Sequence, residues 1–181
     1  GVRITVHDHP EFGVTFSRAD GMFDLAVNGG GDLTVTYDKT GFCPVQRQLK
    51  VTWQDYVPVP DVVMIPMDPI VTAVAMGTNS PMQVHQGSMQ SDADGDRKAT
   101  LLFTPGTCAN IILPNGTTQA VNSLSVRATE FTVGTNGPSA MPAVLPPTSG
   151  YTYCVELSAD EAMAQGATDV QFDRPVFTYV E

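Results

Sequence analysis

The sequence predicts an all-β chain of two consecutive β-sandwich domains, with one short helix near residues 159–165. Short runs of alternating apolar and polar residues recur along the 181 residues, whereas long helical periodicity is missing. The 16 glycines and 14 prolines are typical of a chain with many turns between short strands. Hydrophobic residues make up 42% of the chain, which is enough to form a core.

The first predicted domain, residues 1–68, contains a hairpin as its clearest feature. Asp20 and Gly21 predict a tight turn, because Asp can bond to nearby backbone and Gly tolerates positive φ. The alternating run 22–27 then predicts one strand, and the run 33–37 predicts its partner. Further strands are expected at 2–6, 14–16, 45–53 and 62–66.

The second predicted domain, residues 69–181, continues the pattern of short strands and turns. The Pro-, Gly- and Ser-rich run 134–150 is expected to be a long ordered loop. The Asn115-Gly116 pair predicts a hairpin turn between two of the strands. Strands are expected at 71–74, 98–103, 108–113, 118–121, 124–133, 151–157, 170–172 and 175–180.

The helix is predicted from its two ends. Ser158 and Glu161 have the spacing of a capping box, and Gly166 suits the reversal after the last turn. About two turns of helix are marginal alone, so this helix should dock onto the sandwich.

Several separated motifs in the first third of the chain carry a resemblance. They are His9-Pro10-Glu11-Phe12-Gly13, Arg18-Ala19-Asp20-Gly21, Phe23-Asp24-Leu25, Asn28-Gly29-Gly30, Leu33-Thr34-Val35, Gln46-Arg47, Trp53-Gln54-Asp55-Tyr56 and Val62-Val63-Met64. With these motifs the chain resembles the transthyretin-like (carboxypeptidase-regulatory-like) domain of teneurins and of bacterial YD-repeat (Rhs-type) proteins. The remainder is similar to the Ig-like, β-rich region that follows this domain in bacterial YD-repeat proteins.

The resemblance implies a non-catalytic structural module of an extracellular or cell-surface protein, acting as a scaffold or plug among neighbouring domains. It also implies one more strand before Gly1, and its absence would leave a sheet edge unpaired. Unpaired edges recruit strands, so self-association into an oligomer or filament is expected. A calcium- or carbohydrate-binding module and an accessory domain of a secreted enzyme are the alternatives.

The charge balance limits the partners. Nine Lys and Arg residues stand against 19 Asp and Glu residues, which gives a net charge of −10. Such a surface repels nucleic acid and anionic membranes. Nucleic-acid binding is therefore not expected. No apolar run reaches the length of a transmembrane helix, so membrane insertion is not expected either.

The most specific candidate for a metal site is the acidic turn with Asp92, Asp94 and Asp96. Alternating carboxylates around a glycine suit a hard cation such as calcium. Because Gly95 is the fourth residue of this run, the pattern departs from the helix–loop–helix calcium loop. A solvated turn is the alternative.

A second set of potential metal ligands is His7, Asp8, His9 and Glu11. Alternate residues of an extended segment point the same way, so the two histidines could share an ion. The alternative is a loop that serves folding only. His85 has no partner nearby in the sequence, and no nucleophile elbow or phosphate-binding loop occurs, so the chain is not expected to be an enzyme.

The three cysteines, Cys43, Cys108 and Cys154, leave two alternatives open: buried thiols, or a Cys108–Cys154 disulfide with one free thiol. Asn115 begins an Asn-x-Thr sequon on a hairpin tip, and the alternative is a turn that happens to precede a threonine. The aromatic residues Phe42, Trp53 and Tyr56 are expected as core anchors, with an exposed glycan-stacking patch as the alternative.

Overall fold

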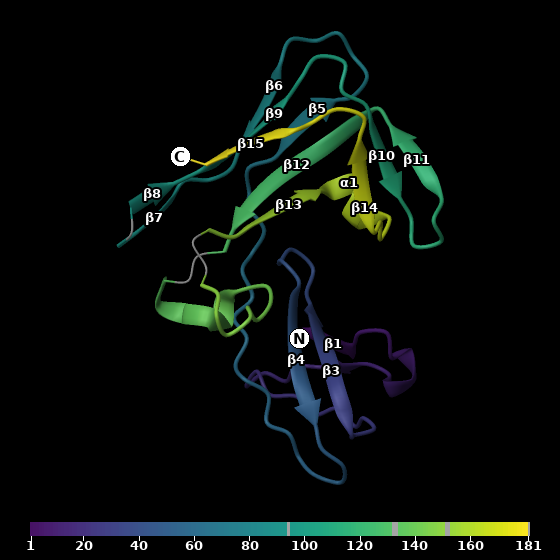
Figure 1. Cartoon of the computed structure of the whole chain (residues 1–181), viewed down its shortest axis with the longest axis vertical. Helices are drawn as coiled ribbons and strands as arrows, with labels where there is room; N and C mark the ends of the chain where they lie inside the picture. The colour runs from purple at the N-terminus through teal and green to yellow at the C-terminus, as the bar shows by residue number, and fades with distance from the viewer. Residues whose placement is uncertain (94, 132–133, 151–152, 181) are drawn as a thin grey trace. The chain divides into compact units, whose positions relative to one another are not determined.

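The structure is a computed structural model that describes residues 1–93, 95–131, 134–150 and 153–180. Its elements are mostly strands that pair antiparallel, which confirms the predicted all-β fold (Figure 1). The chain packs as two compact units, Gly1–Met67 with Phe131–Cys154, and Asp68–Glu130 with Val155–Glu181. Within the described residues, no helix is long and apolar enough to cross a membrane.

The division into domains 1–68 and 69–181 stays a prediction. One segment inside the predicted second domain, Phe131–Cys154, packs with the first unit. The first unit is therefore discontinuous in sequence.

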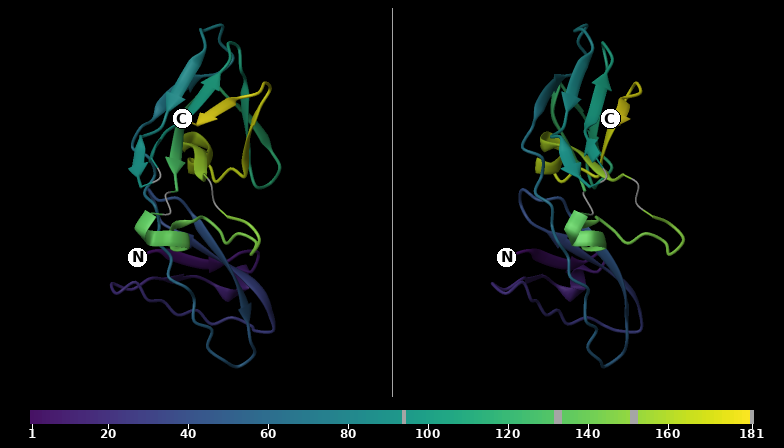
Figure 2. Two further views of the ribbon diagram at one scale, coloured as in Figure 1. Left: turned by 60° about the vertical axis from the view of Figure 1, so that its left-hand side comes forward. Right: turned by 90° about the vertical axis from the view of Figure 1, so that its left-hand side faces the viewer.

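The first unit contains an antiparallel sheet in the order β2-β1-β3-β4. Figures 1 and 2 show its longer strands side by side. Alternation places Ile4, Val35, Tyr37 and Val45 in one buried cluster, as the period-two pattern predicts. The elements before Asp68 are β1 (Arg3–Val6), the 3₁₀ turn η1 (Pro10–Phe12), β2 (Thr15–Phe16), β3 (Gly31–Asp38) and β4 (Val45–Val51).

The predicted hairpin between residues 22–27 and 33–37 is wrong. The turn itself forms, since the Met22 N–H donates to Asp20 Oδ1 at 2.9 Å. However, β3 pairs with β1 on one side and β4 on the other. A strand has only two edges, so residues 22–27 find no place beside β3. They belong to no strand within the described part of the chain, although their burial alternates as in a strand.

The segment after the second unit's β12 returns to cover part of the first unit. Phe131 and Met141 form a buried cluster with Cys43. Buried Arg47 donates from Nη2 to the Ser139 carbonyl at 3.1 Å, so its charge is solvated by backbone oxygens. The Ser139 carbonyl belongs to the 3₁₀ element η2 (Gly134–Ala140). A second hydrogen bond runs from the Gln46 N–H to the Pro142 carbonyl at 2.8 Å.

The second unit consists of short sheets in the orders β13-β12-β5, β15-β9-β6, β11-β10-β14 and β7-β8. One apolar cluster is shared by the three three-stranded sheets and includes Val74, Phe103, Ile111 and Leu124. The strands are β5 (Thr72–Ala75), β6 (Gln83–Gln86), β7 (Gln90–Asp92), β8 (Gly95–Arg97), β9 (Ala99–Phe103), β10 (Ala109–Ile112), β11 (Thr118–Val121), β12 (Ser123–Glu130), β13 (Val155–Ala159), β14 (Asp169–Phe172) and β15 (Phe177–Val180).

The predicted helix exists as α1 (Asp160–Ala164), but the predicted capping box does not. Ser158 lies in β13 opposite Arg127, so the N-cap is Ala159, which makes no side-chain cap hydrogen bond. Glu161 instead accepts from Ser125 N–H at 2.7 Å and from its hydroxyl at 2.8 Å. This contact docks the helix onto β12.

Candidate functional site

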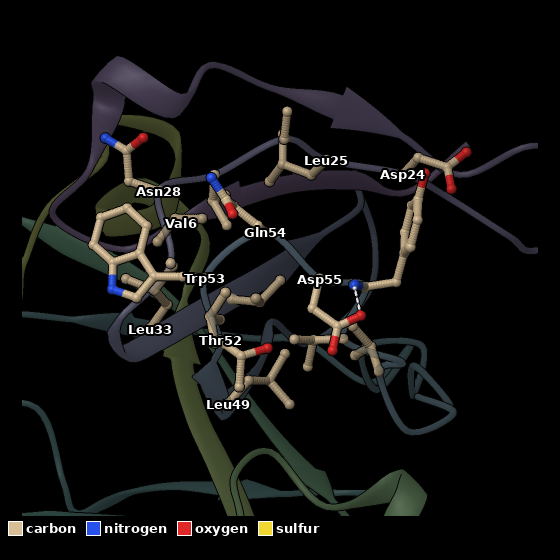
Figure 3. A pocket seen from close by; sticks show the side chains of 18 of the residues that line it. Val6, Asp24, Leu25, Asn28, Leu33, Leu49, Thr52, Trp53, Gln54 and Asp55 are labelled. Carbon is tan, nitrogen blue, oxygen red and sulfur yellow. Dashed lines mark hydrogen bonds between the residues drawn. The ribbon is translucent and has the colours of Figure 1, made fainter.

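A cavity of about 680 Å³ in the first unit is an open apolar groove on the sheet. Its floor comes from β1, β3 and β4, through the side chains of Val6, Leu33, Val35, Leu49 and Val51. Alternation along these strands places these apolar residues on one face. Figure 3 shows Val6, Leu33 and Leu49 in this groove, with polar side chains around them.

Two segments without regular pairing form the walls of the groove, residues 23–29 and residues 52–59. They meet at one end, where the Gly30 N–H donates to Val51 O at 2.7 Å. A Cβ on Gly29 would lie 2.1 Å from Thr52 O, so only glycine permits this approach. Gly30 has φ +96° and lies against the Trp53 indole.

Trp53 and Tyr56 lie at the groove and are exposed, so their prediction as core anchors is wrong. The exposed fraction is 69% for Trp53 and 96% for Tyr56. β4 ends at Val51, so alternation no longer directs Trp53 toward the core. Phe42 is half-buried and packs under the Lys39 ammonium, 4.3 Å from the ring centroid.

The charged residues that line the groove are both acidic, Asp24 and Asp55. Asp24 Oδ2 accepts a hydrogen bond from Arg18 Nη1 at 2.6 Å, and this ion pair raises the pKa of Arg18. Asp55 Oδ1 accepts from the Tyr56 N–H at 2.8 Å, the dashed line in Figure 3. Asn28 and Gln54 add neutral polar groups.

A second cavity, about 440 Å³, lies within the second unit beside β13 and α1. Glu156 and Ser158 of β13 both line it. Burial raises the pKa of Glu156. The Ser158 hydroxyl is buried and makes no hydrogen bond to any described residue. Activation of a serine requires an adjacent base within hydrogen-bond reach, and this hydroxyl contacts none in that part of the chain.

Two of the three predicted calcium ligands, Asp92 and Asp96, lie on the paired strands β7 and β8. Asp92 holds Arg97 in a fork, with Oδ1–Nη1 at 2.9 Å and Oδ2–Nη2 at 2.6 Å. Asp92 faces Gly95 across the hairpin and Asp96 faces Ser91, so the two carboxylates lie on opposite faces. Asp94 lies outside the described residues. The calcium site therefore stays a prediction.

The other predicted ligand set, around His7 and His9, divides into two neighbour pairs. His9 Nδ1 lies 2.8 Å from Glu11 Oε1, and this hydrogen bond lowers the pKa of the glutamate. His7 Nε2 lies 3.5 Å from Asp8 Oδ2. No group of three or more metal-ligating side chains gathers among the described residues.

Of the two alternatives for the cysteines, buried thiols hold for Cys43 but not for Cys108, which is an exposed free thiol and so forms no disulfide with Cys154 either. Cys154 instead packs against the cluster that contains Cys43. Asn115 lies at the tip of the β10–β11 hairpin, as predicted, and its Oδ1 accepts from the Thr117 N–H at 2.9 Å. Glycosylation there stays a prediction.

No pattern in the sequence points directly to the groove. The pattern that could have indicated a wall of the groove is the alternating run 22–27, which on its own predicts a strand of a hairpin. A half-buried segment without a partner strand is visible only once the neighbours of β3 are known.

Comparison with known proteins identifies relatives for the first 64 residues of the chain. Residues 1–64 match the family model of the Teneurin TTR-like domain. Teneurin-1 of Gallus gallus is 41% identical and teneurin-m of Drosophila melanogaster 42% identical over 64 residues. Teneurin-1 of Homo sapiens is 36% identical over 64 residues. These matches support the resemblance of the first part of the chain to the teneurin transthyretin-like domain.

The matched part is a small share of this chain and a smaller share of each relative. In each of these three proteins it covers 35% of this chain and 2% of the relative. The chain thus spans a small fraction of the length of the curated relatives it matches. The resemblance of residues after 64 to the β-rich region of YD-repeat proteins stays a prediction.

Proposed function

We propose that the chain is a non-catalytic structural module of an extracellular YD-repeat-type protein, where it acts as a scaffold or plug between neighbouring domains. The observation that carries this proposal is the match of residues 1–64 to the Teneurin TTR-like domain. The curated relatives that share this domain are far longer than the chain, so the domain occurs there in a large polypeptide.

The use of charged side chains supports a structural role. Asp68 is 4% exposed and accepts from Ile70 N–H at 2.7 Å and from Ser88 N–H at 2.7 Å. Arg97 joins the β7–β8 hairpin to Glu130 of β12 through a 2.8 Å contact. Arg127 donates to the Asp68 carbonyl at 2.7 Å. Such bonded charges fix segments relative to one another within a unit.

Self-association through an edge strand is the second part of the proposal. β15 is an edge strand of the β15-β9-β6 sheet. Its alternate residues Phe177 and Tyr179 are 54% and 58% exposed and lie on one face of the sheet. Val84 of β6 is also exposed and lies on the same face of the sheet. An edge strand beside an exposed apolar face favours pairing with another chain.

Sedimentation at increasing protein concentration tests self-association. We expect larger species to grow with concentration, and we expect Tyr179→Lys to abolish them. Val144→Lys is the matched control, since Val144 is an exposed apolar residue at 69% in the first unit. A chain that stays monomeric at every concentration contradicts the assembling role but leaves the scaffold role intact.

An enzymatic role is tested by assays with peptide, ester and glycoside substrates. We expect no turnover above that of the buffer. Turnover that is lost on Ser158→Ala or Glu156→Gln, in variants that stay folded, would contradict the non-catalytic role.

A further inference from the structure

The wall segment 23–29 of the first unit has the burial pattern of a strand without the pairing of one. Phe23, Leu25 and Val27 are half-buried, whereas Asp24 and Ala26 are exposed. Among the described residues, no backbone N–H or C=O of 23–29 bonds to another backbone group. Extended backbone with free donors and acceptors is a template for strand addition.

The opposite wall, residues 52–59, also belongs to no strand among the described residues, and it begins with a turn in which Gln54 has φ +54°. Its backbone groups make no hydrogen bond with backbone elsewhere in the described chain. Pro58 lacks an N–H group and the Tyr56 N–H already donates to Asp55, so the row of donors is interrupted here, whereas it is continuous along the wall 23–29. An added strand would therefore find its fuller set of backbone partners along 23–29.

The floor between the walls is apolar and long enough for several side chains. It is built from residues of β1, β3 and β4, and the cavity of about 680 Å³ lies within the range of ligand-binding clefts. Alternate side chains of an added strand would point onto this floor, because successive residues of a strand face opposite sides.

The charges of the groove indicate the composition of such a strand. Its charged lining residues are Asp24, which Arg18 already pairs at 2.6 Å, and Asp55, which accepts from the Tyr56 N–H. The Asp55 carboxylate is therefore the group that favours a lysine on the added strand. We propose that the groove receives one extended peptide segment, in which apolar side chains alternate with lysine and threonine, and that this segment pairs with the backbone of 23–29. This proposal rests on the proposed structural role and adds to it the binding surface, which is the groove, and the partner, which is an extended peptide segment.

An oligosaccharide or a small apolar ligand explains less of the groove. Either could contact the exposed Trp53, yet neither would satisfy a row of consecutive backbone groups along 23–29. A peptide strand satisfies those groups and covers the apolar floor at the same time.

The probe is a synthetic eight-residue peptide in which valine alternates with lysine and threonine. Its control is a peptide of the same composition in which the valines are consecutive. We expect the alternating peptide to change the Trp53 fluorescence and to bind at least about tenfold more tightly than the control. Equal binding of the two peptides would contradict the proposal, because the pairing register would then be irrelevant.

Amide hydrogen exchange on the unmodified chain locates the site. The alternating peptide should protect the amides of residues 23–27, which are unpaired without it. Binding without protection of these amides would place the peptide elsewhere and overturn the proposal.

A matched pair of variants tests the role of the inward side chains. Leu25→Lys places a charge among the half-buried residues of the wall, whereas Ala26→Lys places it at an exposed neighbour. We expect Leu25→Lys to abolish peptide binding and Ala26→Lys to leave it within about twofold. Thermal melting of both variants shows whether the first unit remains folded.

The outcomes separate this proposal from the structural role. If the alternating peptide fails to bind while the chain is stable and shows no turnover, the groove proposal is wrong and the structural role stands. If a soluble oligosaccharide binds the groove and displaces the peptide, the chain is a carbohydrate-binding module and both are wrong. If turnover is found, the structural role fails irrespective of peptide binding.

Discussion

The carboxylate of Asp68 holds Ser88 through two hydrogen bonds, from the serine N–H to Oδ2 at 2.7 Å and from its hydroxyl to Oδ1 at 2.9 Å. Oδ1 also accepts from the Ile70 N–H at 2.7 Å. The side chain is buried, so water does not replace a lost partner easily. The segment 68–70 is thereby tied to residue 88 within the second unit.

Asp68→Asn should therefore destabilise the second unit. An amide presents an NH₂ group where one carboxylate oxygen now accepts, which leaves a donor facing a donor. We expect the free energy of unfolding in urea to fall by about 2 kcal/mol. Asp61→Asn, at an exposed position, should change it by less than about 0.5 kcal/mol. Equal effects of the two substitutions would contradict the role assigned to the Asp68 contacts.

The close approach of residue 29 to residue 52 gives a second prediction. A Cβ on Gly29 would lie 2.1 Å from the Thr52 carbonyl oxygen, and backbone cannot move aside as a flexible side chain can. Gly29→Ala should lower the free energy of unfolding of the first unit by about 2 kcal/mol. Gly31→Ala is the control, because nothing lies within 4 Å of its Cβ position. Wild-type stability in Gly29→Ala would show that the two walls do not meet there.

The buried imidazole of His85 predicts a loss of stability in acid. Its Nδ1 lies 2.9 Å from Thr72 Oγ1, and its buried Nε2 has no hydrogen-bond partner among the described residues. Burial lowers the pKa of His85 from 6.5, although the negative charge of Asp68 opposes this shift. The folded state therefore favours the neutral ring, and the unfolded state binds a proton first as the pH falls.

The stability that His85 contributes is fully present above pH 6.5 and is lost as the pH falls through the lower folded pKa. We expect a slope of at most about 1.4 kcal/mol per pH unit from this group. Urea unfolding of wild type and His85→Gln between pH 7 and pH 5 measures the difference. His7→Gln, at an exposed histidine, should keep the wild-type slope. A slope that survives in His85→Gln must come from another group.

Calcium binding at Asp92, Asp94 and Asp96 is tested by calorimetry together with a charge variant. Arg97 now occupies both carboxylate oxygens of Asp92. We expect Arg97→Gln to tighten calcium binding by about tenfold, because the guanidinium then no longer competes with the ion for these oxygens. Arg174→Gln removes an equal charge elsewhere and should have no such effect. If neither wild type nor Arg97→Gln binds calcium, the predicted site is wrong.

The strands that the sequence predicts best are those with local signals. Residues 118–121 and the preceding strand flank Asn115-Gly116, and the structure pairs them as β10 and β11. The wrong predictions concern residues whose structure depends on pairing with strands far away in the sequence. Residues 22–27 do not pair with β3, because β1 and β4 already occupy both of its edges. Ser158 does not cap the helix, because it is part of β13 and pairs with Arg127 of β12. Tertiary competition of this kind leaves no local pattern.

The candidate groove was only partly foreseeable for the same reason. The alternation of 22–27 is real, but its meaning depends on which edges are occupied elsewhere. The exposure of Trp53 depends on where β4 stops, and the periodic pattern of the sequence continues past that point. Burial at such positions follows from the assembled sheet and not from the residue type.

The interleaved order of the two packed units affects how the protein is made. On the ribosome, residues 1–67 emerge long before Phe131 and Met141, which cover Cys43. The nascent polypeptide must therefore carry an incomplete first unit while the greater part of the second is translated. A recombinant fragment that stops at residue 67 would lack this cover permanently, so expression trials should extend through Cys154.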